Sequence, residues 1–123
     1  MDLYLKTQPQ IFSQILKTHG LQIRAKRNYF DAKLKTKLGR IHAMYAVIDG
    51  NLYCDLHFDY RIHLFFIGVD YSKTPNAFFS EKLLPSLIEY NISFSIQDVS
   101  WFTRKNESKL FGYKVKNAKV NGA

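Results

Sequence analysis

The sequence has little cysteine and no long apolar run, and each shortage excludes a class of protein. Cys54 is the only cysteine, so no disulfide can form within the chain, which is typical of the reducing cytosol. The longest apolar run is Leu64–Ile67, extended through Gly68 to Val69, whereas a membrane-spanning helix needs roughly 20 residues. The N-terminus has no apolar signal segment. We therefore expect a cytoplasmic protein with no membrane partner.

The sequence also lacks the short motifs that identify many nucleotide-binding and metal-dependent enzymes. It contains no P-loop, no GxGxxG, no HExxH and no pair of CxxC motifs. No motif therefore indicates an enzymatic activity, and only individual residues can suggest one.

Acidic residues are scarce and basic residues are in excess, with 18 Lys and Arg against ten Asp and Glu. The excess is confined to two segments: residues 17–40 hold eight basic residues and one acid, and residues 103–119 hold six and one. Residues 41–102 are net negative, with three basic residues against seven acids. This segregation favours a polyanionic partner such as nucleic acid. The alternative is a general enrichment in solvated lysine that serves no partner.

Length and hydrophobic content predict one folded domain. A chain of 123 residues, 46% of them hydrophobic, can bury a substantial core. We expect a single α+β domain over residues 1–118 and a frayed tail at 119–123. The predicted fold is an antiparallel or mixed sheet of about six strands with two helices, in the order α-β-β-β-β-α-β-β.

The first part of the chain predicts one helix and two strands. A helix over residues 8–19 begins after the capping residue Thr7 and ends before Gly20. Its apolar residues recur at helical spacing: Ile11, Phe12, Ile15 and Leu16. Alternating apolar and polar residues then predict strands over 21–26 and 31–38.

A hairpin follows, because Asp49-Gly50 is a strong signal for a two-residue type I′ turn. The turn joins strands over 41–48 and 51–58 and fixes their register. This register places four pairs on the core face: Val47 with Leu52, Tyr45 with Cys54, Ala43 with Leu56, and Ile41 with Phe58. Cys54 is therefore expected to be an inert core residue.

The second part of the chain predicts a strand over 63–69 and a helix over 74–89. Thr74 is the expected N-cap of this helix, and Pro85 is expected to kink or divide it. Two further alternating segments predict strands over 92–97 and 111–116.

The basic residues of the first segment suggest a surface that contacts phosphates. A period of two sends Lys33, Lys35 and Lys37 to one strand face, where they repel one another unless an anion lies over them. An equally good explanation is a solvated edge strand that resists aggregation. The residues predicted to contact nucleic acid are Arg24, Lys26, Arg27, Lys33, Lys35, Lys37, Arg40, Arg104 and Lys105, with Tyr29 or Trp101 stacking on bases.

The hairpin register also gathers a cluster of Asp and His on the face opposite the core. Asp55, His57 and Asp59 share this face, opposite His42 and Arg40. As a metal site, Asp55, His57 and Asp59 would suit a divalent cation, Mn²⁺ or Zn²⁺ better than Mg²⁺. As a metal-free site, His42 or His57 would act as a general base while Arg40 stabilises charge on a phosphate.

Two structural explanations compete with a site of either kind. The cluster can be the solvated face of a strand, with Arg40 and Asp59 as an ordinary cross-strand ion pair. It can also pack against the second helix as a buried polar network.

Three functions are consistent with the sequence. The leading hypothesis is a nucleic-acid-binding protein, for DNA or RNA. The second is a metal-dependent or RNase-like phosphodiesterase that uses Asp55, His57, Asp59 and His42. The third is an inhibitor or accessory protein, of the kind that mobile elements encode, which dimerises or binds an acidic protein partner.

Overall fold

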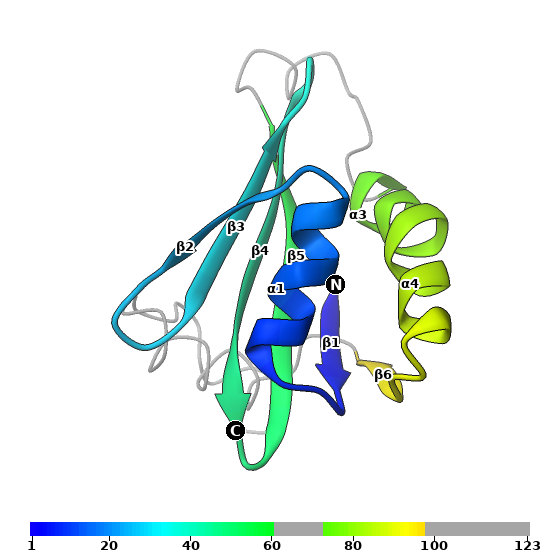
Figure 1. The fold of residues 1–123 in the computed structure, drawn as a ribbon. Helices are drawn as coiled ribbons and strands as arrows, with labels where there is room; N and C mark the ends of the chain where they lie inside the picture. Colours follow the sequence, from blue (N-terminus) through cyan, green and yellow to red (C-terminus); the bar gives the residue numbers. More distant parts are fainter. Residues whose placement is uncertain (61–72, 98–123) are drawn as a thin grey trace, which may run out of the picture.

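The computed structural model describes residues 1–60 and 73–97. They form an α+β fold with one six-stranded sheet and two helical segments (Figure 1). The strands are β1 (Asp2–Leu5), β2 (Gln22–Ala25), β3 (Phe30–Lys35), β4 (Gly39–Ile48), β5 (Asn51–Tyr60) and β6 (Phe94–Gln97). The helical segments are α1 (Pro9–Thr18) and the run α3 (Lys73–Phe78), η1 (Phe79–Leu83) and α4 (Leu84–Glu89).

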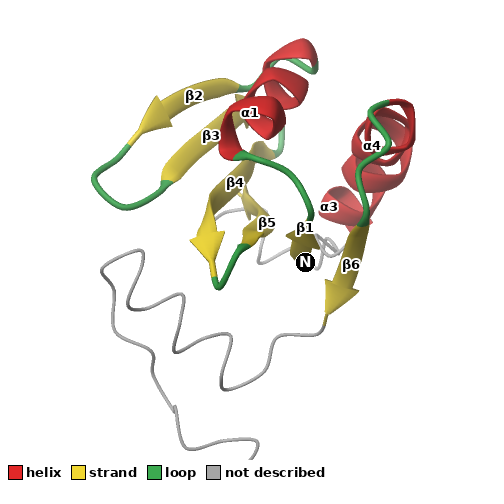
Figure 2. Ribbon diagram, turned by 60° about the horizontal axis from the view of Figure 1, so that its bottom comes forward, coloured by secondary structure: helices red, strands yellow, loops and turns green. Residues whose placement is uncertain are grey.

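The sheet is antiparallel throughout the described strands, in the spatial order β2-β3-β4-β5-β1-β6. Both helical segments lie on the same side of this sheet (Figure 2). The predicted α+β class, strand number and helix number are therefore confirmed. Neither helical segment has the length and apolar content that a membrane span requires.

The β4–β5 hairpin has the predicted register, from Arg40 opposite Asp59 to Val47 opposite Leu52. Both turn residues have positive φ, 50° at Asp49 and 81° at Gly50, as a type I′ turn requires. Seven of the eight residues expected on the core face are buried; Val47 is 54% exposed. Among the described residues, the pairing of β3 with β4 ends at Tyr45, so β3 does not extend beside Val47.

Strand β1 is the principal correction to the predicted order, which began with a helix. It inserts between β5 and β6 and buries Leu3 and Leu5 completely. Only four residues long, β1 offers too few alternations to stand out in a sequence pattern. Its pairing with two distant segments is a tertiary effect that local periodicity does not encode.

Helix α1 agrees with its predicted position but begins differently. Its N-cap is Gln8, which makes no side-chain capping bond, so the predicted Thr7 cap is wrong. Pro9 begins the helix, where a missing backbone N–H costs nothing. At the other end, Gly20 adopts φ +91° and donates its backbone N–H to Lys17, as predicted for a glycine that ends a helix.

The second helical segment begins at Lys73, one residue before the expected cap Thr74, and is divided near Pro85 as predicted. The division takes the form of the π-helical turn η1, in which the N–H of Leu84 reaches back five residues to the carbonyl of Phe79. Proline removes a backbone donor and crowds the preceding turn, which the wider π-turn accommodates.

Strand β3 ends at Lys35, so Lys37 lies in the turn between β3 and β4 rather than on the predicted strand over 31–38. The Thr36 N–H donates to the Gly39 carbonyl at 2.7 Å and closes this turn. The predicted strands over 63–69 and 111–116, the tail at 119–123, and Trp101, Arg104 and Lys105 lie outside the described residues.

The core lies between the sheet and the helices and contains one polar contact at its centre. Tyr45 is fully buried, and its hydroxyl lies 2.6 Å from Ser13 Oγ of α1. The ring packs edge-on against Phe12 and stacks on Phe30. Burial raises the pKa of Tyr45 to about 12 despite the Ser13 hydrogen bond, and burial also raises the pKa of the Cys54 thiol well above its ordinary value. Cys54 is therefore an inert core residue, as expected.

The Tyr45–Ser13 contact gives a first prediction. Tyr45→Phe leaves the Ser13 hydroxyl buried without its partner, so we expect the free energy of unfolding to fall by about 1–3 kcal/mol. Urea unfolding measures this loss. Tyr90→Phe, at a tyrosine that is 49% exposed, is the matched control and should leave stability nearly unchanged. Equal stability of the two variants would show that the buried hydroxyl pair contributes nothing.

Candidate functional site

The side chains of the candidate site all point to the sheet face opposite the helices. The registers of β3, β4 and β5 arrange them in three rows across the strands. Successive rows lie two residues apart along each strand, so side chains of adjacent rows reach one another diagonally. The rows are Asp31, Met44 and Asp55; then Lys33, His42 and His57; then Lys35, Arg40 and Asp59.

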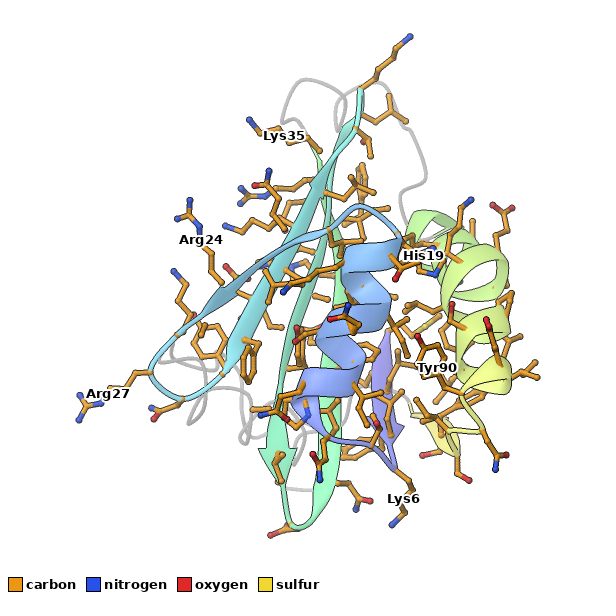
Figure 3. All side chains as sticks on the ribbon, viewed as in Figure 1. Lys6, His19, Arg24, Arg27, Lys35 and Tyr90 are labelled. Atoms are coloured by element: carbon orange, nitrogen blue, oxygen red, sulfur yellow. The ribbon has the colours of Figure 1, made fainter. Side chains whose placement is uncertain are left out.

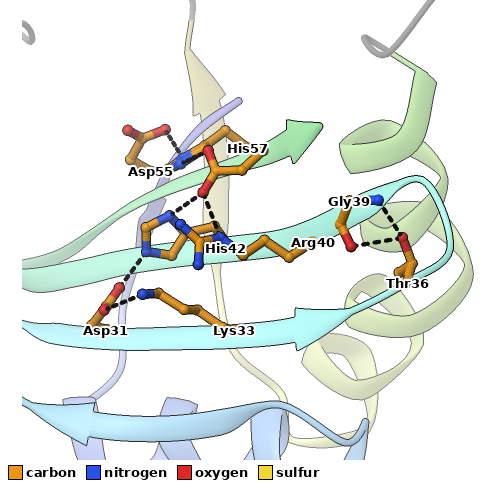
Figure 4. A network of polar contacts seen from close by, with 9 residues as sticks. Asp31, Lys33, Thr36, Gly39, Arg40, His42, Asp55 and His57 are labelled. Atoms are coloured by element: carbon orange, nitrogen blue, oxygen red, sulfur yellow. Dashed lines mark hydrogen bonds and ion pairs between the residues drawn. The ribbon is translucent and has the colours of Figure 1, made fainter. Parts of the chain in front are cut away.

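Asp59 is the centre of a polar network on this face. Figure 4 labels its three partners, Arg40, His42 and His57. Its Oδ2 lies 3.1 Å from Nδ1 of His42 and accepts a hydrogen bond from Nε of Arg40 at 3.0 Å. Its Oδ1 lies 3.2 Å from Nε2 of His57. One carboxylate therefore contacts two imidazoles and one guanidinium.

The far ring nitrogen of each histidine faces a second carboxylate. Nε2 of His42 hydrogen-bonds with Oδ1 of Asp31, and Oδ2 of Asp31 forms an ion pair with Nζ of Lys33 at 3.5 Å. Nδ1 of His57 lies 3.5 Å from Oδ1 of Asp55. The two rings approach to 4.6 Å between centroids. The network thus alternates carboxylates and imidazoles across three strands.

Electrostatics favour charged forms within this network. Burial by itself would raise the pKa of Asp31, but the hydrogen bond and charge of His42, with the charge of Lys33, outweigh burial and lower this pKa. Burial would lower the pKa of His57, but Asp55 and Asp59 outweigh it and raise this pKa above the ordinary 6.5. The network therefore holds an ionised Asp31 and favours a proton on His57.

Three network residues bring potential metal ligands together: His42, His57 and Asp59, with one ligand atom of each within 4.8 Å of the others. The sequence placed Asp55, His57 and Asp59 in a metal site. In the structure Asp55 contacts the ring nitrogen of His57 that points away from Asp59. The same imidazoles, held by carboxylates, also suit proton transfer, because such a partner fixes the ring and stabilises its protonated form.

A pocket of about 510 Å³ lies beside the network, over β2, β3 and β4. Its lining contains one carboxylate, Asp31, and five basic side chains: Arg24, Lys26, Lys33, Lys35 and Arg40. Four of these cations are exposed residues, and the side chain of Lys33 is 41% exposed. Figure 3 shows Arg24 and Lys35 projecting from this part of the sheet. The pocket is strongly positive and accessible to solutes.

The other residues predicted to contact nucleic acid that lie within the described part of the chain do not line this pocket. Arg27 and Tyr29 lie in the turn between β2 and β3, and Figure 3 shows Arg27 at its tip. Lys37 lies in the β3–β4 turn. Five of the nine predicted basic residues therefore converge, and two others occupy turns at separate places.

Asp31, Lys33 and Arg40 belong to both the pocket and the network. The sequence pattern does not place Asp31 and Lys33 in the Asp/His cluster, because only the β4–β5 register can be predicted from a turn. The pairing of β3 with β4, closed at Thr36–Gly39, is what brings these two residues to His42. A second polar pair on this face was also missed: the Tyr53 hydroxyl donates to the buried carboxylate of Asp2 at 2.8 Å.

The geometry does not fit either structural explanation of the cluster, a solvated strand face or a network packed against the second helix. The network does not pack against the second helix, which lies on the opposite, apolar face with Phe78, Phe79 and Leu83 in the core. A merely solvated strand face does not describe His42 and Asp31, whose side chains are only 12% and 10% exposed. The ion pair of Arg40 with Asp59 is present, but it is one contact within a larger network.

Neither a protein family, nor a curated protein, nor a solved structure matches this chain. Its function must therefore be argued from the pocket and the network themselves.

The lowered pKa of Asp31 gives a second prediction. Because its folded-state pKa lies below the ordinary 3.8, the ionised carboxylate stabilises the fold above that pH and loses this effect as the pH falls through the folded-state value. We expect Asp31→Asn to lower the free energy of unfolding by about 1.5–3 kcal/mol at pH 7. Urea unfolding from pH 7 to pH 3 should show the gap to wild type narrowing below about pH 4. A gap that stays constant would contradict the ionised Asp31–His42 contact.

Proposed function

We propose that this chain binds nucleic acid by holding backbone phosphates in the basic pocket. The observation that carries the proposal is the convergence of five cations, four from strands β2, β3 and β4 and one just after β2, on one pocket that contains a single carboxylate. Like charges gathered in this way repel one another, and an anion placed among them removes that repulsion. Phosphate contacts of this kind give affinity without sequence preference.

The individual side chains fit a phosphate backbone. Lys35, Arg24 and Lys26 are exposed, so their charges are available without rearrangement of the sheet. Arg40 uses Nε to bind Asp59. Its two terminal guanidinium nitrogens provide further donors, and their planar geometry suits phosphate oxygens. Rigid strands carry all of these groups except Lys26, which directly follows β2.

The third prediction tests this pocket with charge-neutral variants. We expect Lys33→Gln combined with Lys35→Gln to weaken binding of a labelled 16-nucleotide strand and to reduce the log–log salt slope. The reduction should be about 0.7 per lysine for single strands and about 0.9 for duplex DNA. Fluorescence anisotropy across a salt series, with DNA and RNA in single-stranded and duplex form, measures both quantities. The matched control is Lys82→Gln, at an exposed lysine of the helical layer.

Two results would overturn the proposal. One is an unchanged salt slope in the double lysine variant together with a reduced slope in Lys82→Gln. The other is no binding by the wild-type chain at low salt, a result that would favour an acidic protein partner or self-association instead.

Cleavage of the bound phosphodiester is a second candidate function, favoured by one observation. Asp31, Lys33 and Arg40 line the pocket and also contact the His/Asp network. A phosphate held by Arg40 would lie next to the network. His57 or His42, whichever is unprotonated, would then take the proton of the attacking hydroxyl. The bond from phosphorus to the leaving oxygen would break as that oxygen takes a proton from the other histidine or from water, and Arg40 would stabilise the charge that develops on the phosphorus oxygens.

The fourth prediction separates cleavage from binding. If the network is catalytic, His57→Gln should lower the cleavage rate of a labelled RNA by about 100-fold or more, because general-base catalysis contributes at least that much. The dissociation constant for the same RNA should stay within about threefold, since His57 does not line the pocket. His19→Gln, at a histidine in the helical layer that bonds Ser86, is the control. Equal cleavage rates in wild type and His57→Gln, or none in wild type, would end this candidate.

A further inference from the structure

We infer that His42, His57 and Asp59 form a binding site for one divalent transition-metal ion of the zinc type. This inference rests on ligand geometry and not on nucleic-acid binding, so either can fail without the other. It also assigns a set of ligands different from the Asp55, His57 and Asp59 that the sequence pattern indicated.

Two of the three separations between ligand atoms are close to those that a metal ion requires. Nδ1 of His42 and Nε2 of His57 lie 3.1 and 3.2 Å from the two oxygens of Asp59. Ligands at about 2.0–2.1 Å from a tetrahedral zinc ion lie roughly 3.3 Å from one another. All three ligand atoms lie within 4.8 Å of one another, so an ion between the two nitrogens and the carboxylate requires them to close by up to about 1.5 Å, a movement that side-chain rotation can supply.

The ring nitrogens that point away from Asp59 supply an independent observation. Nε2 of His42 is bonded to Asp31, and Nδ1 of His57 faces Asp55 at 3.5 Å. Metal-binding histidines almost always donate their second ring N–H to such a partner, which fixes the tautomer and aims the lone pair of the other nitrogen at the metal. Here Nε2 of His42 has that hydrogen bond, while Nδ1 of His57 is buried with a carboxylate at 3.5 Å but no hydrogen bond to any described residue. Both remaining nitrogens point at the carboxylate of Asp59.

Protonated imidazoles or one metal ion can each satisfy the contacts of this network. A neutral imidazole has one N–H, so with a carboxylate at each ring nitrogen one lone pair must face an anion. Only doubly protonated rings could donate to Asp31, Asp55 and both oxygens of Asp59. A single divalent cation provides the same total charge as two such protons and leaves both imidazoles neutral.

The donor set defines the class of ion. Two imidazoles and one carboxylate suit zinc, and also Mn²⁺ or Fe²⁺, rather than Mg²⁺ or Ca²⁺, which prefer oxygen ligands. Three protein ligands leave coordination positions for water or substrate, as in catalytic metal sites. The side chains of His57 and Asp59 are 32% and 37% exposed, so an ion can enter from solvent.

Two cations beside the site oppose metal binding. Arg40 donates to Asp59 Oδ2 at 3.0 Å, and Lys33 forms an ion pair with Asp31. Replacing Arg40 by Gln removes a positive charge next to the ion, so the variant should bind metal more tightly. The same variant should bind nucleic acid more weakly, because Arg40 lines the basic pocket. This one substitution therefore moves the two activities in opposite directions.

The fifth prediction uses Zn²⁺ as the probe and the purified 123-residue chain after treatment with a chelator. Isothermal titration with Zn²⁺ alone should show one ion per chain. Asp59→Asn and His57→Gln should each weaken binding by about 100-fold or more, a larger loss than for residues behind the ligands. His19→Gln should leave binding unchanged. Co²⁺ in place of Zn²⁺ should give a visible absorption band that Asp59→Asn abolishes.

Two further variants test the surroundings of the ion. Asp31→Asn, which removes the carboxylate behind His42, should weaken Zn²⁺ binding by about 10–100-fold. Arg40→Gln should strengthen it about twofold to fivefold, the range expected for an exposed charge pair. Circular dichroism of each metal-free variant confirms that the fold is retained. Zn²⁺ binding that survives both Asp59→Asn and His57→Gln, or a wild-type chain that binds no Zn²⁺ at 1:1 stoichiometry, overturns the inference.

Discussion

The register of β3, β4 and β5 is the constraint on which every functional feature of the sheet depends. Side chains alternate between the two faces of a strand, so a shift of one residue would move His42, His57 and Asp59 into the apolar core. The type I′ turn at Asp49-Gly50 fixes one of the two registers, and the turn at Thr36–Gly39 fixes the other. Burial of Ile41, Ala43 and Leu56 against the helices then makes any slip costly. Stability of the core and position of the polar network are thus consequences of the same pairing.

The hairpin and the main helices could be predicted because their signals are local. Asp49-Gly50 requires two positive φ angles, and the apolar spacing of α1 spans only ten residues, so neither depends on distant contacts. Strand β1 could not be predicted in this way. Its partners lie about 50 and 90 residues away, and its four residues carry no turn signal that would set a register. The exposure of Val47 has the same origin, since it reflects where β3 stops pairing and not any property of Val47 itself.

The residues of the candidate site likewise fall into those that a local signal predicts and those that depend on a second strand pairing. Placing His42 opposite His57 and Arg40 opposite Asp59 needed only the hairpin register, and the sequence predicted both. Asp31 and Lys33 reach the network through a second pairing, and the pattern over 31–38 gave their face but not their neighbours. Lys37 shows the converse case. Alternation placed it beside Lys35, but the chain turns at Thr36, so periodicity overestimated the length of the strand and the number of aligned lysines.

The shared residues couple the basic pocket to the network. Arg40 and Lys33 neutralise Asp59 and Asp31 in the structure, and both also line the pocket. A phosphate in the pocket would compete with these carboxylates for the same two cations. Arg40 and Lys33 would then neutralise less of the negative charge of Asp59 and Asp31. The stronger negative charge would favour a divalent cation bound to Asp59 and to His42. By linkage, the cation would raise the affinity for phosphate by the same factor. An anion and a metal ion that assist each other at adjacent positions are what phosphodiester chemistry requires, because the reacting phosphate carries negative charge that the ion stabilises.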